Sequence, residues 1–249
     1  MKNDELNILD AELSSPLDQI NSVGVEVENT PPDPEQMLKL LESEVNSERM
    51  LAARAFCEIE DPRSIPLLIN LLDDVCPLVR VSTTYALGRN TDPAAVQPLI
   101  DLLARDFNGY VRKGIVWALG NSKDSRALSP LIHALKTDIS AVRLWSASGL
   151  AQIAPAKYED IITAIPPLIQ SLRGDTIGAV RSNCAWAIGQ LCRELPSNVV
   201  YATAIDALIE SLVEDEDFGV KDDARSAILK VGDPRGLQMI EELELEGLI

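Results

Sequence analysis

The stretch RDFNGYVRKGIVWALG at residues 105–120 decides the fold, because its pattern recurs along most of the chain. The pattern is an Asp, then Val-Arg, then Ala-x-Gly or a close variant of it. Further stretches that share it are DDVCPLVRVSTTYALG (73–88), TDISAVRLWSASGLA (137–151), GDTIGAVRSNCAWAIG (174–189) and EDEDFGVKDDARSAIL (214–229). Repetition on this scale is typical of architectures in which each unit packs only against its neighbours.

One basic residue in each stretch fixes the period. We number positions from this residue, so that +5 is the fifth residue after it. The basic residues are Arg80, Arg112, Arg143, Arg181 and Lys221, with Arg49 as an earlier member. The steps between them are 31, 32, 31, 38 and 40 residues, which match or lie just below the period of two-helix repeats. The two longer steps predict extended loops late in the chain.

An apolar block precedes each basic residue, as in PLIDLL (98–103), PLIHAL (130–135) and PLIQSL (167–172). Its spacing of i, i+1, i+4 places the apolar residues on one face of a helix. Each repeat is therefore predicted to hold a first helix, a tight turn around the Asp, and a second helix that begins near Val-Arg. Prolines inside the first helices are expected to kink them; these are Pro98, Pro130 and Pro167.

A second Asp lies twelve residues after four of the basic residues. In three cases a Pro follows it, which is the pattern of a helix N-cap with Pro at the first helical position. The predicted caps are Asp61, Asp92, Asp124 and Asp233.

Together these signals predict an all-α solenoid of about six two-helix repeats with a C-terminal capping helix. The predicted repeats are 34–61, 62–91, 92–123, 124–156, 157–196 and 197–231, followed by GLQMIEELELEGL at 236–248. The predicted domains are a flexible acidic N-terminal segment at 1–33 and the repeat solenoid at 34–249.

The charge of the chain excludes several classes of partner. Its net charge is −17 over 249 residues, so a phosphate backbone or an anionic membrane would be repelled. Acids interrupt the apolar residues at 1–13, unlike a secretory signal, and no apolar run approaches the roughly 18 residues of a membrane span. We therefore expect a cytoplasmic protein that binds neither nucleic acid nor membrane.

The residues that could carry chemistry are few. Cys57, Cys76, Cys184 and Cys192 form no C-x-x-C pair, and we interpret them as structural thiols, with a ligand shared with a partner as the alternative. The single histidine, His133, excludes a multi-histidine metal site and a Ser-His-Asp triad, and we expect it to be partly buried. The sequence predicts no catalytic residue, no cofactor and no metal.

The repeats resemble the HEAT-like repeats of the phycobilin-lyase type found in cyanobacteria, over residues 34–249. The stretches GYVRKGIVWALGN, RLWSASGLAQIA, RSNCAWAIGQLCRELPSNVVYATA and GDPRGLQMIEELELEGL resemble more particularly the cyanobacterial HEAT-repeat proteins associated with the A-type iron-sulfur carrier IscA. This resemblance implies a HEAT-like fold whose second helices line a concave face. It also implies an IscA-like carrier as partner, in iron-sulfur or iron-responsive metabolism.

Positions +2, +5 and +9 of the second helices fall together on a face beside the core positions. Aromatic side chains there alternate with amides and Arg, which is the composition of a binding hot spot. The alternative for the Trp residues is that they fill wide gaps between repeats. Ser148 and Ser226 occupy +5 in two repeats, so packing is not expected to require an aromatic residue at that position. The candidate partner-binding residues are Tyr85, Arg89, Trp117, Asn121, Trp145, Gln152, Asn183, Trp186 and Gln190.

The leading hypothesis for function is a non-enzymatic scaffold that grips a protein partner such as an IscA-like carrier. The alternative is a phycobilin lyase or lyase subunit, which attaches or removes a linear tetrapyrrole on phycobiliproteins. A third hypothesis is an adaptor in phycobilisome turnover, which would bind a phycobiliprotein without performing chemistry.

Overall fold

The predicted all-helical fold is confirmed. The computed structural model describes residues 32–248, and this range holds 13 α-helices, α3 to α15, and no strand. It divides into two compact units, unit 1 up to Ser122 and unit 2 from Lys123 onward. The predictions made for residues 1–31 lie outside the described part of the chain.

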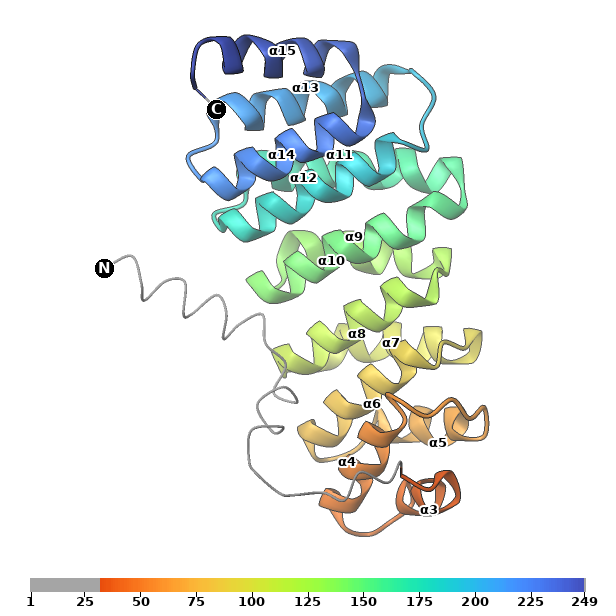
Figure 1. Ribbon diagram of the computed structural model, residues 1–249. Helices are drawn as coiled ribbons and strands as arrows, with labels where there is room; N and C mark the ends of the chain where they lie inside the picture. The colour runs from red at the N-terminus through yellow and green to blue at the C-terminus, as the bar shows by residue number, and fades with distance from the viewer. Residues whose placement is uncertain (1–31, 249) are drawn as a thin grey trace, which may run out of the picture. The chain divides into compact units, whose positions relative to one another are not determined.

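Unit 1 contains three two-helix repeats, as the repeat pattern predicted. Their second helices lie side by side, and each first helix packs against its own second helix (Figure 1). The helices are α3 (Pro34–Leu40), α4 (Asn46–Ala55), α5 (Ser64–Leu71), α6 (Pro77–Arg89), α7 (Pro93–Arg105) and α8 (Gly109–Ser122).

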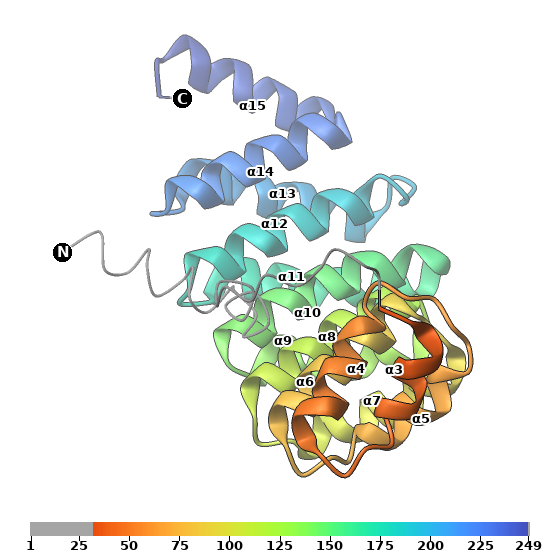
Figure 2. The same ribbon diagram turned by 60° about the horizontal axis from the view of Figure 1, so that its bottom comes forward.

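Unit 2 repeats this arrangement three times and ends in the predicted capping helix (Figure 2). Two short 3-10 turns, η1 (Ser125–Ala127) and η2 (Ala154–Ala156), precede the first helices of its first two repeats. The α-helices are α9 (Leu128–Thr137), α10 (Ser140–Ile153), α11 (Tyr158–Gly174), α12 (Gly178–Cys192), α13 (Val199–Glu214), α14 (Phe218–Val231) and α15 (Pro234–Leu245).

The long repeat steps late in the chain arise mainly from helix length. Helices α11 and α13 have 17 and 16 residues, whereas the equivalent α7 has 13. The prediction of extended loops was therefore largely wrong. A sequence step counts residues without showing whether helix or loop contains them.

Helix caps confirm most of the Asp predictions. Asp92 accepts a hydrogen bond from the Ala94 amide, Asp124 caps η1, and Asp233 accepts one from the Arg235 amide. Asp61 differs, because α5 begins only at Ser64. The Asp61 carboxylate accepts a hydrogen bond from the Arg63 amide in the turn before the helix.

The core follows the helical period that the sequence predicted. Leu87, Leu119, Leu150, Ile188 and Ile228 all lie at +7, and all are buried. Burial of such side chains is the main term that stabilises a packed helix pair.

Close approach of neighbouring second helices explains the glycine at +8. A Cβ on Gly189 would lie 2.6 Å from the Cβ of Ala227 in the next repeat, which is closer than van der Waals contact permits. The small residues therefore set how closely adjacent second helices pack.

Two predictions for α9 fail, each for its own reason. His133 is exposed, because the buried face of α9 is formed by Leu131, Ala134 and Leu135 and the histidine lies outside it. Pro130 lies in the first turn of α9, where the amide nitrogen has no helical acceptor to lose, so no kink is required. In contrast, Pro98 and Pro167 lie inside α7 and α11.

No helix within residues 32–248 combines the length and the apolar character that crossing a membrane would require.

Candidate interaction surface

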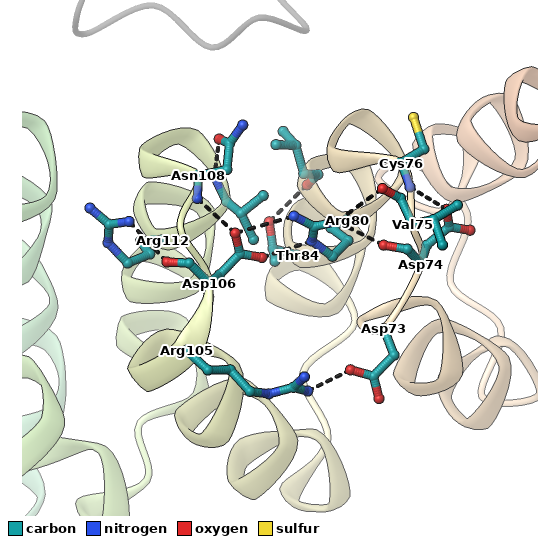
Figure 3. Close-up of polar contacts among 12 residues, drawn as sticks. Asp73, Asp74, Val75, Cys76, Arg80, Thr84, Arg105, Asp106, Asn108 and Arg112 are labelled. Carbon is teal, nitrogen blue, oxygen red and sulfur yellow. Dashed lines mark hydrogen bonds and ion pairs between the residues drawn. The ribbon is translucent and has the colours of Figure 1, made fainter.

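A ladder of ion pairs joins successive repeats inside each unit. In unit 1, Arg80 Nε donates to Asp106 Oδ2 over 2.7 Å, and Arg80 Nη1 donates to the backbone oxygen of Asp74 over 2.7 Å (Figure 3). The Asp106 carboxylate also accepts the Asn108 amide over 2.8 Å. One Arg thus ties the turn of its own repeat to the turn of the next.

The same arrangement recurs in both units. Arg49 in unit 1, and Arg143 and Arg181 in unit 2, each pair with the turn Asp of the following repeat. The Nε–Oδ2 distances are 2.6 Å for Arg49–Asp74, 2.7 Å for Arg143–Asp175 and 2.8 Å for Arg181–Asp215. Recurrence of the same pair within both units indicates that these Arg and Asp side chains have a structural role. Lys221 differs, because its Nζ donates to the backbone oxygen of Val213.

Electrostatics keep two of the ladder carboxylates, Asp74 and Asp215, ionised. Burial by itself would raise the pKa of Asp74, but hydrogen bonds from Arg49 and from the Cys76 amide outweigh burial and lower that pKa below its usual value. The pKa of Asp215 is lowered in the same way by Arg181 and the Asp217 amide, against the effect of burial. These carboxylates are therefore charged near neutral pH and suited to a structural role.

The candidate face of unit 1 is an aromatic cluster. The Tyr85 and Trp117 rings lie 5.2 Å apart between centroids, and the Arg89 guanidinium lies 5.7 Å from the Trp117 ring centroid, within cation-π range. A Cβ on Gly88 would lie 2.4 Å from the Trp117 ring. Trp117 is therefore half-buried against α6, so here the aromatic side chain contributes to packing, contrary to the inference from Ser148 and Ser226.

Asn121 is the fourth candidate residue of unit 1, and its side-chain amide makes a hydrogen bond within the protein. Its Nδ2 donates to the backbone oxygen of Gly88 over 3.1 Å, which links α8 to α6. Asn90 makes the equivalent link one repeat earlier, donating to the backbone oxygen of Phe56. Asn90 was not among the candidate residues, although an amide at +10, next to the candidate position +9, was a visible signal.

In unit 2, α10 and α12 carry the remaining candidates. Asn183 Nδ2 donates to the backbone oxygen of Leu144 over 2.6 Å and to Ser148 Oγ over 2.7 Å, so it too bridges neighbouring second helices. The other four are half-buried on the same two helices: Trp145, Gln152, Trp186 and Gln190. Each unit thus presents its own set of half-exposed aromatic and amide side chains.

The thiols divide between the units. Cys184 and Cys192 are buried in α12, and burial raises the pKa of Cys192 to about 12. Cys57 and Cys76 are partly exposed, and burial raises the pKa of Cys57 to about 11. Within residues 32–248, no group of three or more His, Cys, Asp or Glu side chains is arranged to hold a metal ion.

Sequence reasoning missed the surface at the turns of unit 1. Val75 and Phe107 are strongly exposed, each directly after a ladder Asp. The available signal was a large apolar residue in an otherwise polar turn.

Comparison with known proteins places the chain in a family. HEAT repeats match residues 34–115 and 96–189, more than half of the chain. No curated protein matches the sequence. A designed armadillo repeat protein in complex with the peptide (KR)4 is 23% identical, with a TM-score of 0.60 over 80% of this chain and 100% of that one. The complex of CpcE and CpcF of phycocyanin lyase from Nostoc sp. PCC7120 is 23% identical, with a TM-score of 0.60 over 88% and 85%. At these identities the structural likeness shows the fold alone, and the family match shows that the chain belongs to the HEAT-repeat family.

Proposed function

We propose that the chain is a non-enzymatic scaffold that binds a protein partner through the half-exposed face of its second helices. The observation that carries this proposal is the chemistry at +5 and +9. Trp186 and Gln190 occupy these positions on α12, and both remain half-exposed. Trp and Tyr are enriched among the residues that dominate binding energy, and amides beside them supply directional hydrogen bonds.

The proposed partner is an IscA-like iron-sulfur carrier. Support for it comes from the resemblance of the stretches around Arg112 and Arg181 to HEAT-repeat proteins associated with that carrier. The charge at the C-terminal end fits a partner with a basic surface, because residues 214–249 hold eleven acids and four bases.

Binding of a purified IscA-type carrier to the full chain tests this proposal, with biolayer interferometry as the readout. Trp186→Ser should weaken binding by about 2 kcal/mol, roughly thirtyfold. Tyr158→Ser is the matched control, because Tyr158 is an exposed aromatic of the same unit at the start of α11, outside both the candidate face and the acidic C-terminal end. Equal affinity for wild type and Trp186→Ser would contradict the proposed face, and no binding of the carrier by wild type would contradict the partner.

The second candidate is a phycobilin lyase, or an adaptor for phycobiliprotein. The likeness of fold to the CpcE and CpcF complex of phycocyanin lyase favours it. Incubation of the chain with a free bilin, with and without an apo-phycobiliprotein, separates the hypotheses. A strong change in visible absorption supports the lyase and contradicts the scaffold. Binding of phycobiliprotein with unchanged absorption supports the adaptor.

A further inference from the structure

Unit 1 exposes apolar side chains along one row of turns. Val45, Val75 and Phe107 lie in three successive turns between first and second helices, and their exposed fractions are 50%, 85% and 101%. Leu78 and Tyr110, in the first turns of α6 and α8, are also exposed. We call these five residues the turn edge. Apolar side chains that gather on one strip of a surface are typical of a site of interaction.

A hollow of about 460 Å³ lies between the second and third of these turns. Its apolar lining consists of Leu72, Pro77, Leu102 and Phe107. Around it lie the ladder pair Arg80–Asp106 and the more exposed pair Arg105–Asp73, both drawn in Figure 3. The hollow therefore offers the exposed apolar surface of Pro77 and Phe107 next to charges that are already paired, which suits an inserted apolar side chain.

Unit 2 contains an equivalent hollow that serves as an internal control. It has about 470 Å³ and lies beside the ladder pair Arg143–Asp175. There Thr176 occupies the position of Phe107, and Ser171 occupies the position of Leu102. The fold thus forms such a hollow without an aromatic residue at its edge, so packing does not require the exposed ring of Phe107.

The charge around the turn edge is negative. Glu42, Glu44 and Glu48 are exposed beside Val45, while the exposed base Arg105 is already paired with Asp73. Residues 1–31 of the chain carry seven acids and a single base, so this segment would be repelled. A complementary partner is therefore basic at the end that meets the glutamates.

Spacing indicates the form of the partner. Neighbouring packed helices lie about 8–10 Å apart, and residues i and i+7 of a helix lie about 10.5 Å apart along its axis. A helix laid across the turns would therefore place two apolar side chains in register with successive repeats, as in helix-in-groove recognition. We propose that the turn edge of unit 1 docks an amphipathic helix of a partner protein. This helix carries apolar residues two turns apart and Lys or Arg at the end that meets Glu42, Glu44 and Glu48.

The test uses a labelled helical peptide of Ala and Gln with two Leu residues two turns apart and three Lys residues at one end. A companion peptide carries Glu in place of Lys. Fluorescence anisotropy with the full chain should show binding of the Lys peptide and much weaker binding of the Glu peptide. Phe107→Thr, which introduces the residue that unit 2 has, should weaken binding about tenfold or more. Phe218→Thr, at an equally accessible aromatic in unit 2, should change it less than about twofold.

Other outcomes overturn the proposal. These are absence of binding by wild type, equal effects of the two Phe substitutions, and a preference for the Glu peptide. Sedimentation velocity tests a different occupant of the turn edge. A wild-type dimer that is lost in Phe107→Thr would show that a second copy of the chain, and not a partner helix, binds there. Phe107→Thr should keep the melting temperature of wild type, since the ring is exposed, and this separates lost binding from lost folding.

Discussion

Units 1 and 2 have the same ladder and differ in the surfaces beside it. Arg80 and Arg143 pair with the next turn Asp through Nε–Oδ2 distances of 2.7 Å in both units. Directly after that Asp, unit 1 has Phe107 and unit 2 has Thr176. Residues that recur at equivalent positions therefore carry the fold, while exposed residues that differ are free to serve binding.

The second-helix faces differ in the same way. Both units link second helices through an Asn amide, Asn121 in unit 1 and Asn183 in unit 2. Unit 1 adds a tilted contact between Trp117 and Tyr85, with Arg89 over the Trp117 ring. One repeat framework thus accommodates two contacts of different chemistry. Four predictions sharpen this comparison, from the largest expected effect to the smallest.

Loss of a ladder carboxylate should have the largest effect, and it should be equal in the two units. Asp106→Ala and Asp175→Ala each remove two Arg hydrogen bonds and a turn cap, and leave a half-buried Arg without its carboxylate. We expect each to lower the free energy of unfolding by about 3 kcal/mol in urea titration. Asp73→Ala is the control, since its pair with Arg105 is exposed and is worth less than about 1 kcal/mol. If only one of the two substitutions lowers the free energy of unfolding, the ladders of the two units are not equivalent.

Trp117→Ser should lower the free energy of unfolding by about 2 kcal/mol. This is roughly half the cost of truncating a fully buried Trp, since the ring packs on Gly88 and Tyr85 but remains partly exposed. Arg89→Gln removes only the cation-π contact and should cost about 0.5 kcal/mol. Thermal and urea unfolding measure both. An unchanged stability of Trp117→Ser would restore the sequence-based view that packing does not require this ring.

Acidification should weaken the ladder in both units. A carboxylate whose pKa is lowered in the folded state adds stability that is complete above its unfolded pKa of about 3.9 and is lost as pH falls through the folded pKa. The pKa values of Asp74 and Asp215 are both lowered. The stability difference between wild type and Asp74→Asn, or Asp215→Asn, should therefore be constant from pH 7 to about 5 and shrink below about 4. A difference that grows on acidification would contradict the assigned direction.

Thiol reactivity should distinguish the units with no change in stability. Cys184 and Cys192 of unit 2 are buried with raised pKa values, so they should react with a disulfide reagent at pH 8 only after unfolding. Cys76 lies at the start of α6 and should give the fast phase. Cys76→Ser should remove that phase, and its persistence would assign it to another thiol.

The sequence by itself determined the repeat framework. The recurrence of Asp, Val-Arg and Ala-x-Gly predicted the six helix pairs and the caps at Asp92 and Asp233. This prediction was possible because every repeat has the same local packing requirements. A misleading residue in one repeat is therefore outweighed by the equivalent residues of the other repeats.

Only the tertiary structure decided how exposed each side chain is where the repeats differ. Exposure depends on the neighbouring repeat, which a pattern in one helix does not contain. His133 therefore faces solvent, Trp117 packs on the glycine of the preceding second helix, and Phe107 projects from its turn. The exposure of the periodic residues was predictable because their environment is the same in every repeat. The exposure of these three residues was not predictable, because it depends on a single contact with a neighbouring helix or on the absence of such a contact.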